Sequence, residues 1–354
     1  PGRSRPARVL GTETSSENRL TTMSRIFNSD LDSILEGTSR SFYLSLKELP
    51  REIRKQVSLL YMLARTSDTI ADSEGGEPED LLQALESYNE FTQGNSEEAP
   101  DLEELSEFQS NISEGLLLKN VGKVASNISQ FSESDQKSIR NCLGIIIGGQ
   151  ILDLKRFSSG VNGIPSIEEN DELDDYAYRV AGSVGKFWTQ MSLDHLFKIK
   201  EENEAEIFEN GVRFGKALQM INILRDIPAD LELGRCYIPR RGLDEHGMSP
   251  SDLLDSSKME SFRPLYNEYL DLTAQHLDSA VQYIEMLPHS QFRLRGSCML
   301  PVIIGKKTVS LLRGRNVLDP EKKVKISRSE VKEVVKKVIM AVPFKGSSKR
   351  LLRE

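Results

Sequence analysis

YMLARTSDTIAD at residues 61–72 and QMINILRDIPADLELGRCYIP at residues 219–239 are built on the same plan. Each segment continues a largely apolar run, and each carries two aspartates four residues apart with an arginine close by. On an α-helix, side chains at this spacing point within about 60° of one another. The sequence therefore predicts two helices that each present a carboxylate pair on one face. The pairs are Asp68 with Asp72, and Asp226 with Asp230.

Two carboxylates one turn apart in an apolar helix repel each other and lose hydration, so they need a positive partner. Magnesium suits this position, because it binds one or two carboxylates, keeps several waters and takes further ligands from phosphate oxygens. Two such faces predict a cavity that holds two diphosphates. The competing interpretation is a solvated surface, since the chain has 54 acidic residues and chance gives roughly eight acid pairs at this spacing. The apolar runs VSLLYMLA and FGKALQMINIL, which precede the two pairs, favour the functional interpretation.

The overall charge and the cysteines exclude several classes of function. A formal net charge of −8 argues against a nucleic-acid partner, which would need a basic stripe. Cys142, Cys236 and Cys298 are odd in number and far apart, so neither a disulfide framework nor a zinc site is expected. The four histidines show no HExxH or other paired metal spacing. A reducing cytoplasm is the expected compartment.

Residues 1–29 are expected to be a disordered extension. They lack the hydrophobic segment of a secretory signal, and the part before residue 26 is rich in Arg, Ser and Thr. Because the chain opens on Pro1, an upstream extension is as plausible as an organelle transit peptide. The apolar stretches at residues 141–152 and 297–305 are too short to span a bilayer, so no transmembrane helix is expected.

Helical periodicity runs through nearly all of residues 30–345, and no convincing alternating strand pattern occurs. We therefore predict one all-α domain over this range, followed by a basic tail at residues 346–354. Helices are expected at 30–36, 50–71, 78–91, 131–157, 172–196, 202–231, 251–258, 262–286 and 293–312.

Pro228 lies inside the helix expected at residues 202–231. Proline removes one backbone donor and clashes with the preceding turn of a helix. We therefore expect a kink between Asp226 and Asp230.

The end of the chain, from KKVKISR onward, is basic and finishes in an amphipathic segment. The simpler interpretation is a solvated helix. The alternative is a weak attraction for an anionic membrane surface, through which a peripheral protein could release an apolar product.

Four segments together form a specific pattern. They are TSRSFYLSLKELP at 38–50, YMLARTSDTIAD at 61–72, DYAYRVAGSVG at 175–185 and QMINILRDIPADLELGRCYIP at 219–239. This pattern strongly resembles the squalene and phytoene synthase family of head-to-head prenyl transferases, over about residues 30–340, and its bacterial-type squalene synthases most. Small departures occur at Ser183 and Phe214, away from the acidic positions.

The resemblance implies a fold and a metal. The fold is the type I isoprenoid synthase bundle, a single domain whose helices surround a central apolar cavity capped by the two aspartate motifs. The metal is magnesium, held between diphosphates and carboxylates. The carboxylates implied are Asp68, Asp72, Asp226 and Asp230.

The resemblance also implies roles for other side chains toward the prenyl diphosphate substrates. Arginines would bind or neutralise diphosphate, because a planar guanidinium matches phosphate oxygens. These are Arg65, Arg225 and Arg235. The segment that lines the first substrate's site in relatives matches Ser39, Arg40, Ser41 and Phe42. Contacts to the diphosphate or the developing cation are implied for Tyr61, Tyr176, Gln219, Asn222 and Tyr237.

The implied chemistry begins with loss of diphosphate, which leaves an allylic cation that the double bond of a second prenyl chain attacks. A basic oxygen, from a tyrosine or the released diphosphate, removes a proton to close a cyclopropane. A second ionisation then takes place in a dry pocket, where aromatic faces tolerate cations. Candidates for the pocket wall are Ser183, Gly182, Gly185 and the Gly148–Gly149 pair, for which tight helix packing is an equally good explanation.

Members of the family differ in the fate of the cyclopropyl intermediate. Reduction of presqualene diphosphate by NADPH gives squalene, whereas proton loss gives dehydrosqualene, or 15-cis-phytoene from geranylgeranyl diphosphate. The spacing of Cys298 and Pro301 in RGSCMLPVIIG resembles the squalene synthase pattern. We favour a squalene synthase, a farnesyl-diphosphate farnesyltransferase of sterol, hopanoid or carotenoid biosynthesis, over a phytoene or dehydrosqualene synthase.

The same branch suggests NADPH as a second cofactor. VKISR at residues 324–328 is similar to a basic strip that holds the NADPH phosphate in squalene synthases. Lys325 matches this strip, but Ser327 stands where those relatives have a second basic residue, so Arg328 would have to substitute. No GxGxxG loop supports nucleotide binding independently.

Two other classes of protein fit the sequence less well. Some relatives of this fold are catalytically dead assembly factors, which should lack complete acidic pairs, whereas all four aspartates stand here. A chain-elongating prenyltransferase or a terpene cyclase would usually show an Asp-Asp-x-x-Asp run, and none is found. A monomer is favoured.

Overall fold

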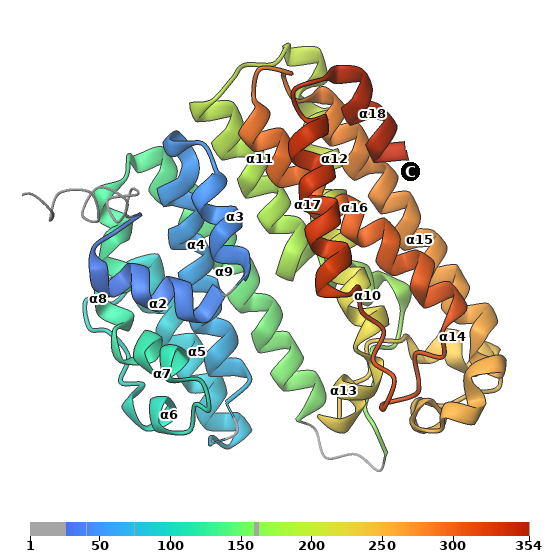
Figure 1. Cartoon of the computed structure of the whole chain (residues 1–354). Helices are drawn as coiled ribbons and strands as arrows, with labels where there is room; N and C mark the ends of the chain where they lie inside the picture. The colour runs from blue at the N-terminus through green and yellow to red at the C-terminus, as the bar shows by residue number, and fades with distance from the viewer. Residues whose placement is uncertain (1–25, 40, 74, 159–162, 354) are drawn as a thin grey trace, which may run out of the picture.

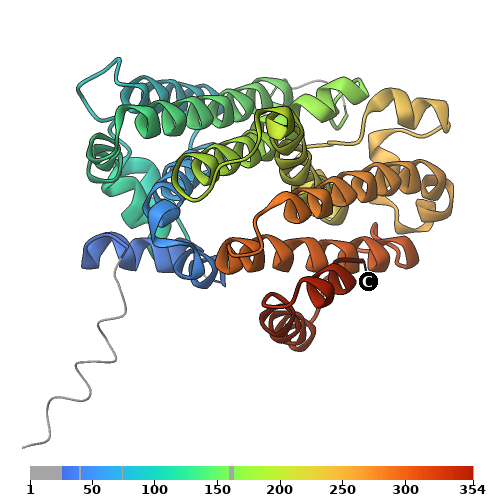
Figure 2. The same ribbon diagram turned by 90° about the horizontal axis from the view of Figure 1, so that it is seen from above.

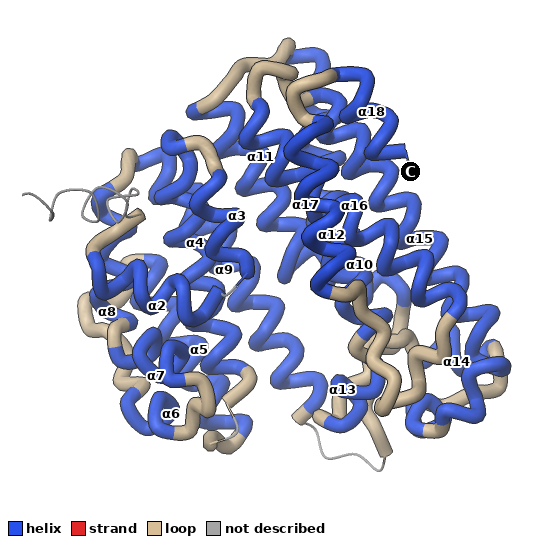
Figure 3. Tube along the Cα trace, in the orientation of Figure 1, coloured by secondary structure: helices blue, strands red, loops and turns tan. Residues whose placement is uncertain are grey.

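The computed structural model describes residues 26–39, 41–73, 75–158 and 163–353, which form a helical protein (Figure 1). No strand occurs among these residues, as the tube coloured by secondary structure in Figure 3 also shows; an isolated β-bridge pairs Ser166 with Cys236. The prediction of an all-α fold is confirmed. Within the part of the chain described, no helix combines the length and the apolar character needed to cross a membrane.

The first half of the chain forms a bundle of short and long helices around α4 and α9 (Figure 1). Pro50 lies directly before the first residue of α4. Ser132 is the N-cap of α9, because its hydroxyl accepts a hydrogen bond from the backbone N–H of Asp135 at 3.2 Å. The elements are α2 (Ser29–Ser39), α3 (Ser41–Glu48), α4 (Arg51–Ala71), α5 (Pro78–Gln93), α6 (Glu103–Glu107), α7 (Ile112–Lys119), α8 (Val121–Ser126) and α9 (Glu133–Phe157).

The second half is built around α12, which packs against both α11 and α15. The helix expected at 172–196 is divided by a π-helical turn, η2 (Tyr178–Gly182), a feature often found at functional sites. The other elements are α10 (Asn170–Ala177), α11 (Ser183–His195), α12 (Glu204–Arg225), α13 (Ile227–Glu232), α14 (Arg240–Glu245), α15 (Met259–Met286), α16 (Phe292–Gly314), α17 (Arg328–Ala341) and α18 (Lys345–Arg353).

Buried apolar side chains form two hydrophobic clusters. The first joins α2–α9 to α11, to the facing ends of α15 and α16, and to α17 and α18. The second lies around α10, α12, α13 and α15 and includes the segment that leads to α17. Viewed from above, α17 and α18 form the outermost layer on the far side of α16 (Figure 2).

The expected kink at Pro228 is present as a break between two helices. Helix α12 ends at Arg225, and Asp226 leaves helical geometry with φ −99° and ψ 14°. Pro228 then lies in the first turn of α13, where a missing backbone donor is tolerated. The break comes at Asp226 itself, because the proline ring would clash with the turn that precedes it.

Residues on both sides of the predicted domain, 26–29 and 346–353, contribute to the fold. Ile26 is buried, and the backbone N–H groups of Ile26 and Phe27 donate to the Asp32 carboxylate at 3.0 and 2.9 Å. Residues 26–29 therefore belong to the folded part of the chain rather than to a disordered extension; residues 1–25 lie outside the described residues. At the other end, the expected basic tail forms α18, which buries Leu351 and Leu352 in the first cluster.

Candidate active site

The first acidic pair lies at the end of α4. Asp68 is partly buried and accepts a hydrogen bond from the side-chain amide of Gln150 on α9. Burial raises the pKa of Asp68 to about 6; the Arg65 charge opposes this shift and the Asp72 charge adds to it. Asp72 comes directly after the last residue of α4, and its side chain is 63% exposed. One carboxylate of the pair is therefore held by a contact to α9, and the other is mostly exposed.

The second acidic pair lies at the junction of α12 and α13. Arg225 donates from Nε to Oδ1 of Asp226 at 2.9 Å, and its Nη2 contacts the other oxygen of the same carboxylate. Burial raises the pKa of Asp230 to about 7, with a further contribution from Asp226; Arg235 opposes the shift, and Asp72 adds to it. The Asp72 carboxylate of the first pair therefore contributes to the raised pKa of Asp230 in the second pair.

Arg235 connects the two pairs. Its Nη1 lies 3.0 Å from Oδ1 of Asp72, while its backbone N–H donates to the carbonyl oxygen of Asp230 at 2.8 Å. The preceding residue, Gly234, has φ +72°, a left-handed conformation that glycine adopts without strain. This turn directs the Arg235 side chain from the second motif back to the first.

Arg65 and Tyr61 extend the site along α4. Arg65 forms an ion pair with Glu114 of α7, while its buried Nε has no hydrogen-bond partner among the residues that the structure describes. The Tyr61 phenol donates to the carbonyl oxygen of Thr38 at 3.3 Å, so it reaches the end of α2. Sequence reasoning named Arg65 and Tyr61 but not Glu114, which lies 49 residues further along the chain.

The segment at residues 39–42 is only partly described. Ser39 is buried, and its hydroxyl donates to the carbonyl oxygen of Leu35 in its own helix. Arg40 and the side chains of Ser41 and Phe42 lie outside the described residues. Tyr61 does, however, lie against Thr38, next to this segment.

Two tyrosines and a further aspartate form a connected group. The Tyr237 phenol donates to Oδ2 of Asp153 at 2.7 Å, and the phenolic oxygens of Tyr176 and Tyr237 are 3.3 Å apart. The two rings stack, with centroids 4.7 Å apart, and Phe157 packs edge-on against Tyr237 at 5.3 Å. Tyr176 and Tyr237 were predicted site residues, and the structure brings them together.

Asp153 was missed by sequence reasoning, although it is the acidic residue of the otherwise apolar run GIIIGGQILDL. Burial raises its pKa to about 6, while the hydrogen bond from Tyr237 and the charge of Arg156 favour the ionised form. Burial also raises the pKa values of both phenols well above their ordinary range, so both keep their protons at neutral pH. The sequence signal that could have identified Asp153 is an acidic residue inside an otherwise apolar helix, because such a residue is rarely buried without a partner.

Gln219 and Asn222 lie on α12 ahead of the second acidic pair. Gln219 is half-buried and Asn222 is exposed, one turn before Asp226. The backbone carbonyl of Asn222 accepts from the Asp226 N–H at 2.9 Å and closes the last turn of α12. Their predicted contacts to diphosphate stay predictions.

The two residues predicted to bind NADPH, Lys325 and Arg328, are exposed where the chain enters α17. Ser327 between them caps this helix, since its hydroxyl and the Glu330 carboxylate exchange hydrogen bonds with each other's backbone. The absence of a second basic residue at Ser327 therefore has a local structural reason.

The glycines proposed for a pocket wall lie in helix packing. A Cβ on Gly185 would overlap the Gly211 carbonyl oxygen, and one on Gly149 would lie 3.0 Å from the Arg179 Cβ. Ser183 is buried and donates to the carbonyl oxygen of Arg179 at 2.7 Å. Close approach of neighbouring helices accounts for Gly185 and Gly149, and the central apolar cavity stays a prediction.

The carboxylates are suited to divalent cations. The raised pKa values of Asp68 and Asp230 arise from burial and from neighbouring carboxylates, both of which a bound cation would offset. Among the described residues, no three Asp, Glu, His or Cys side chains converge closely enough to hold a metal by themselves. Mg²⁺ takes part of its coordination from substrate phosphates and water, and a magnesium site at these carboxylates stays a prediction.

The fold resembles solved isoprenoid synthases. It superimposes on TcSQS in complex with the ligand E5700 with a TM-score of 0.75 and 20% identity, covering 92% of this chain and 89% of that chain. A dehydrosqualene synthase in complex with ligand gives a TM-score of 0.58 at 19% identity, with 88% and 94% covered. Squalene synthase HpnC from Alicyclobacillus acidocaldarius gives 0.57 at 18% identity, with 81% and 94% covered. The protein therefore has the all-α isoprenoid synthase fold.

The sequence assigns this protein to one family among the proteins with the isoprenoid synthase fold. The squalene/phytoene synthase family model matches residues 35–330, and the chain belongs to this family. The bifunctional lycopene cyclase/phytoene synthase of Phaeosphaeria nodorum is 27% identical over 263 residues, 72% of this chain and 41% of the relative. The bifunctional enzyme of Arthroderma gypseum is 33% identical over 147 residues, 41% of this chain and 24% of the relative. The chain spans about two-fifths of the length of the first of these curated relatives.

Proposed function

We propose that this protein catalyses the magnesium-dependent head-to-head condensation of two prenyl diphosphates. The observation that carries the proposal is the ion pair between Arg235 and Asp72, through which both aspartate pairs belong to one site. Magnesium would be held by Asp68, Asp72, Asp226 and Asp230, and it would supply charge neutralisation of the departing diphosphate.

Three arginines are the diphosphate-binding groups in this proposal. Each is paired with a carboxylate in the structure: Arg65 with Glu114, Arg225 with Asp226, and Arg235 with Asp72. A diphosphate offers the same bidentate oxygen geometry as a carboxylate with more charge, so it can replace these partners. The ion pairs keep the guanidinium groups near the site before substrate arrives.

Tyr176 and Tyr237 contribute orientation and aromatic faces. Because their pKa values are raised, they act as neutral phenols, and the released diphosphate is the stronger proton acceptor for closing the cyclopropane. Their stacked rings offer π-faces to a cationic intermediate. Asp153 is a positioning residue, since it accepts the hydrogen bond that fixes Tyr237.

Squalene, formed from farnesyl diphosphate with NADPH, is the first product that we propose. This assignment rests on the Cys298 and Pro301 pattern and on Lys325 and Arg328, which would hold the NADPH phosphate. Val324, in the segment before α17, belongs to the same hydrophobic cluster as α13.

Phytoene or dehydrosqualene, formed without reduction, is the second candidate. The observation that favours it is the phytoene synthase activity in the names of the curated relatives, which match 72% of this chain in the first case. Proton loss would then replace hydride transfer at the last step, and Lys325 would have no nucleotide to bind.

Product analysis separates these proposals. Purified protein is incubated with farnesyl or geranylgeranyl diphosphate and Mg²⁺, with and without NADPH, and the products are identified by mass spectrometry. Squalene that appears only with NADPH supports the first product, whereas phytoene or dehydrosqualene formed regardless of NADPH supports the second. No turnover of either substrate, with Mg²⁺ or with Mn²⁺, would favour a catalytically inactive assembly factor and overturn the proposal.

A further inference from the structure

The last two helices form a packed hairpin on the outside of the molecule. Helix α17 buries Val334 and Val338 against α16, and the turn to α18 is closed by a hydrogen bond from the Phe344 N–H to the Ala341 carbonyl oxygen at 2.9 Å. The Ser348 hydroxyl donates to the same carbonyl at 2.9 Å. Figure 2 shows this pair as the outermost layer of the protein. The hairpin is a fixed element with one face turned outward.

Large apolar side chains are exposed at the turn of this hairpin. Ile339, Met340 and Phe344 are 67%, 56% and 64% exposed. Phe292 of α16, 46% exposed, lies beside them, because His289 packs edge-on against Phe292 and its Nε2 is 3.1 Å from the Pro343 carbonyl oxygen. Single exposed apolar side chains are ordinary, but a group of this kind marks a surface that contacts something apolar.

The same hairpin is strongly basic in an acidic protein. Residues 328–353 contain eight Lys or Arg and two Glu, a net charge of +6 in a chain of net charge −8. Lys337 pairs with Glu333 at 2.9 Å, and Lys349 pairs with Glu285 at 3.7 Å. Lys345, which follows the exposed Phe344, and Arg350 of α18 have no ion-pair partner within the described ranges of the chain.

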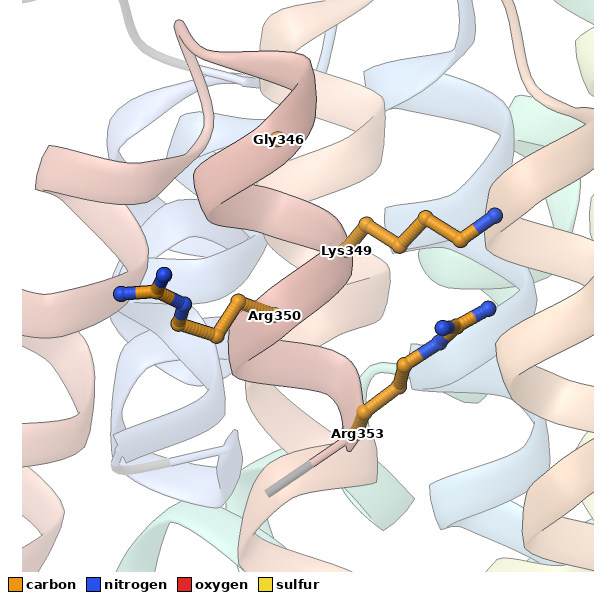
Figure 4. A pocket seen from close by; sticks show the side chains of 4 residues that line it. All are labelled: Gly346, Lys349, Arg350 and Arg353. Atoms are coloured by element: carbon orange, nitrogen blue, oxygen red, sulfur yellow. The ribbon is translucent and has the colours of Figure 1, made fainter.

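Helix α18 also borders an open hollow of about 460 Å³. Lysine and arginine side chains line it, with Gly346 at its edge. Figure 4 shows Lys349 and Arg353 extending to one side of α18 and Arg350 to the other. Cationic side chains therefore project on both flanks of α18.

A second exposed apolar group provides a contrast on the same molecule. Phe108, Ile112 and Leu116, on and beside α7, are 53%, 80% and 45% exposed. The chain around them is acidic, with Asp101, Glu103, Glu104 and Glu107 just before α7. An anionic surface would repel this group and attract the hairpin.

We propose that the hairpin docks the protein on an anionic lipid bilayer. We call the docking face the hairpin surface and define it as Lys332, Lys336, Ile339, Met340, Phe344, Lys345 and Arg350. The apolar members enter the boundary between headgroups and acyl chains, and the basic members contact lipid phosphates. Charge complementarity favours an anionic bilayer as the partner of this surface. The hairpin has a net charge of +6 and the rest of the chain a net charge of −14, so a negatively charged surface attracts the hairpin and repels the rest of the protein.

Vesicle co-sedimentation of the full chain tests the proposal without turnover, so its outcome is independent of the proposed reaction. Vesicles of phosphatidylcholine alone are compared with vesicles that contain about 30% phosphatidylglycerol, at low salt and at about 0.5 M salt. The charge variant is Lys345→Glu with Arg350→Glu. The apolar variant is Ile339→Ser with Phe344→Ser. The matched control, Ile112→Ser with Leu116→Ser, removes equally exposed apolar side chains from the acidic group.

The parent protein should partition at least about tenfold more strongly onto anionic vesicles, and less strongly at high salt. Both hairpin variants should lose about tenfold in partitioning, while the control stays within about twofold of the parent. Thermal melts check that each variant folds, and Met340→Ser alone replaces the apolar variant if that one unfolds. Equal binding to both vesicle types, or retention of binding in both hairpin variants, would overturn the proposal. So would a hairpin variant that converts a dimer to a monomer without changing vesicle binding, because a second copy would then cover this surface.

Discussion

Arg235 Nη1 lies 3.0 Å from Oδ1 of Asp72, so a single ion pair joins two acidic motifs that are 163 residues apart in the sequence. Asp72 is mostly exposed, whereas Arg235 is only 24% exposed. The arginine is therefore the anchored partner, and the carboxylate is the one that can turn to another ligand. In the proposed enzyme, this arrangement lets the Arg235 guanidinium pass from Asp72 to a diphosphate with little movement.

Replacing Arg235 should weaken catalysis without unfolding the protein. Arg235→Ala removes one of three predicted diphosphate-binding cations, and kcat/KM should fall by about 100-fold. Arg235→Lys keeps the charge but loses the bidentate geometry, so it should lie between the parent and the alanine variant. Steady-state kinetics with prenyl diphosphate and Mg²⁺ measure this.

The control for Arg235 is Arg241→Ala. Arg241 is exposed and pairs with Glu169 and Glu245, neither of which belongs to an acidic pair. Its loss should leave kcat/KM unchanged. If Arg235→Ala turned over substrate as fast as Arg241→Ala, the assignment of Arg235 to diphosphate would be wrong.

Asp68→Asn should lower activity while it raises the stability of the fold. The variant loses a predicted magnesium ligand, so turnover should fall by at least about 1,000-fold. Burial opposes ionisation of Asp68, so the neutral amide should raise the free energy of unfolding at pH 8, by about 1 kcal/mol. The amide oxygen can still accept the hydrogen bond from Gln150.

Kinetics and urea unfolding of the same preparation test both halves of this prediction, with Asp278→Asn, at an exposed position on α15, as the control. A thermal shift by Mg²⁺ with inorganic diphosphate should occur in the parent and be lost in Asp68→Asn. Full activity in Asp68→Asn, or an unchanged ligand-induced shift, would contradict the metal assignment.

Residue spacing and local backbone geometry predicted the acidic part of this site from the sequence. Helical spacing singled out the acidic pairs, although Asp72 and Asp226 each lie just past the end of a helix, so neither pair stands on one continuous helix face. The break before Pro228 is explained by the geometry of proline. Asp153 and Gln150 were not found, because their contacts with Tyr237 and Asp68 span 84 and 82 residues. The first contact depends on how α9 packs against the segment after α13, and the second depends on how α9 packs against α4. Periodicity shows that a helix is buried, but it does not show which distant side chains it meets.

The glycines illustrate the same limit. In the sequence, Gly182 and Gly185 fit a pocket wall and tight helix packing equally well. The packing of η2 and α11 against Gly211 and Gly215 of α12 favours the second explanation.

Gly185→Ala should therefore act on stability. The new Cβ would overlap the Gly211 carbonyl oxygen, so α11 and α12 would have to move apart, at a cost of at least about 2 kcal/mol. Gly314→Ala is the matched control, because nothing described lies within 4 Å of a Cβ built there. Urea unfolding at equilibrium compares the two variants. A Gly185→Ala protein that unfolds like the parent but is inactive would instead indicate that Gly185 lines the substrate pocket.

Asp153 should make stability depend on pH. Its pKa in the folded protein is about 6, above the ordinary value for aspartate, so the folded state binds the proton more tightly than the unfolded state does. The free energy of unfolding therefore falls as pH rises through the interval between the two pKa values, and the full penalty is present above about pH 6. Asp153→Asn has no such proton, while its amide oxygen can still accept the hydrogen bond from Tyr237.

Between about pH 5 and pH 8, the parent should lose about 1 kcal/mol more of its free energy of unfolding than Asp153→Asn does. Urea unfolding at the two pH values gives this difference directly, and Asp278→Asn reports the behaviour of an exposed carboxylate on the same fold. Parallel loss of stability in the parent and in Asp153→Asn would mean that Asp153 is already ionised at pH 5. The Tyr237 phenol would then donate to a carboxylate throughout this range, and the charge of Arg156, 3.6 Å from Oδ1 of Asp153, would have outweighed the effect of burial.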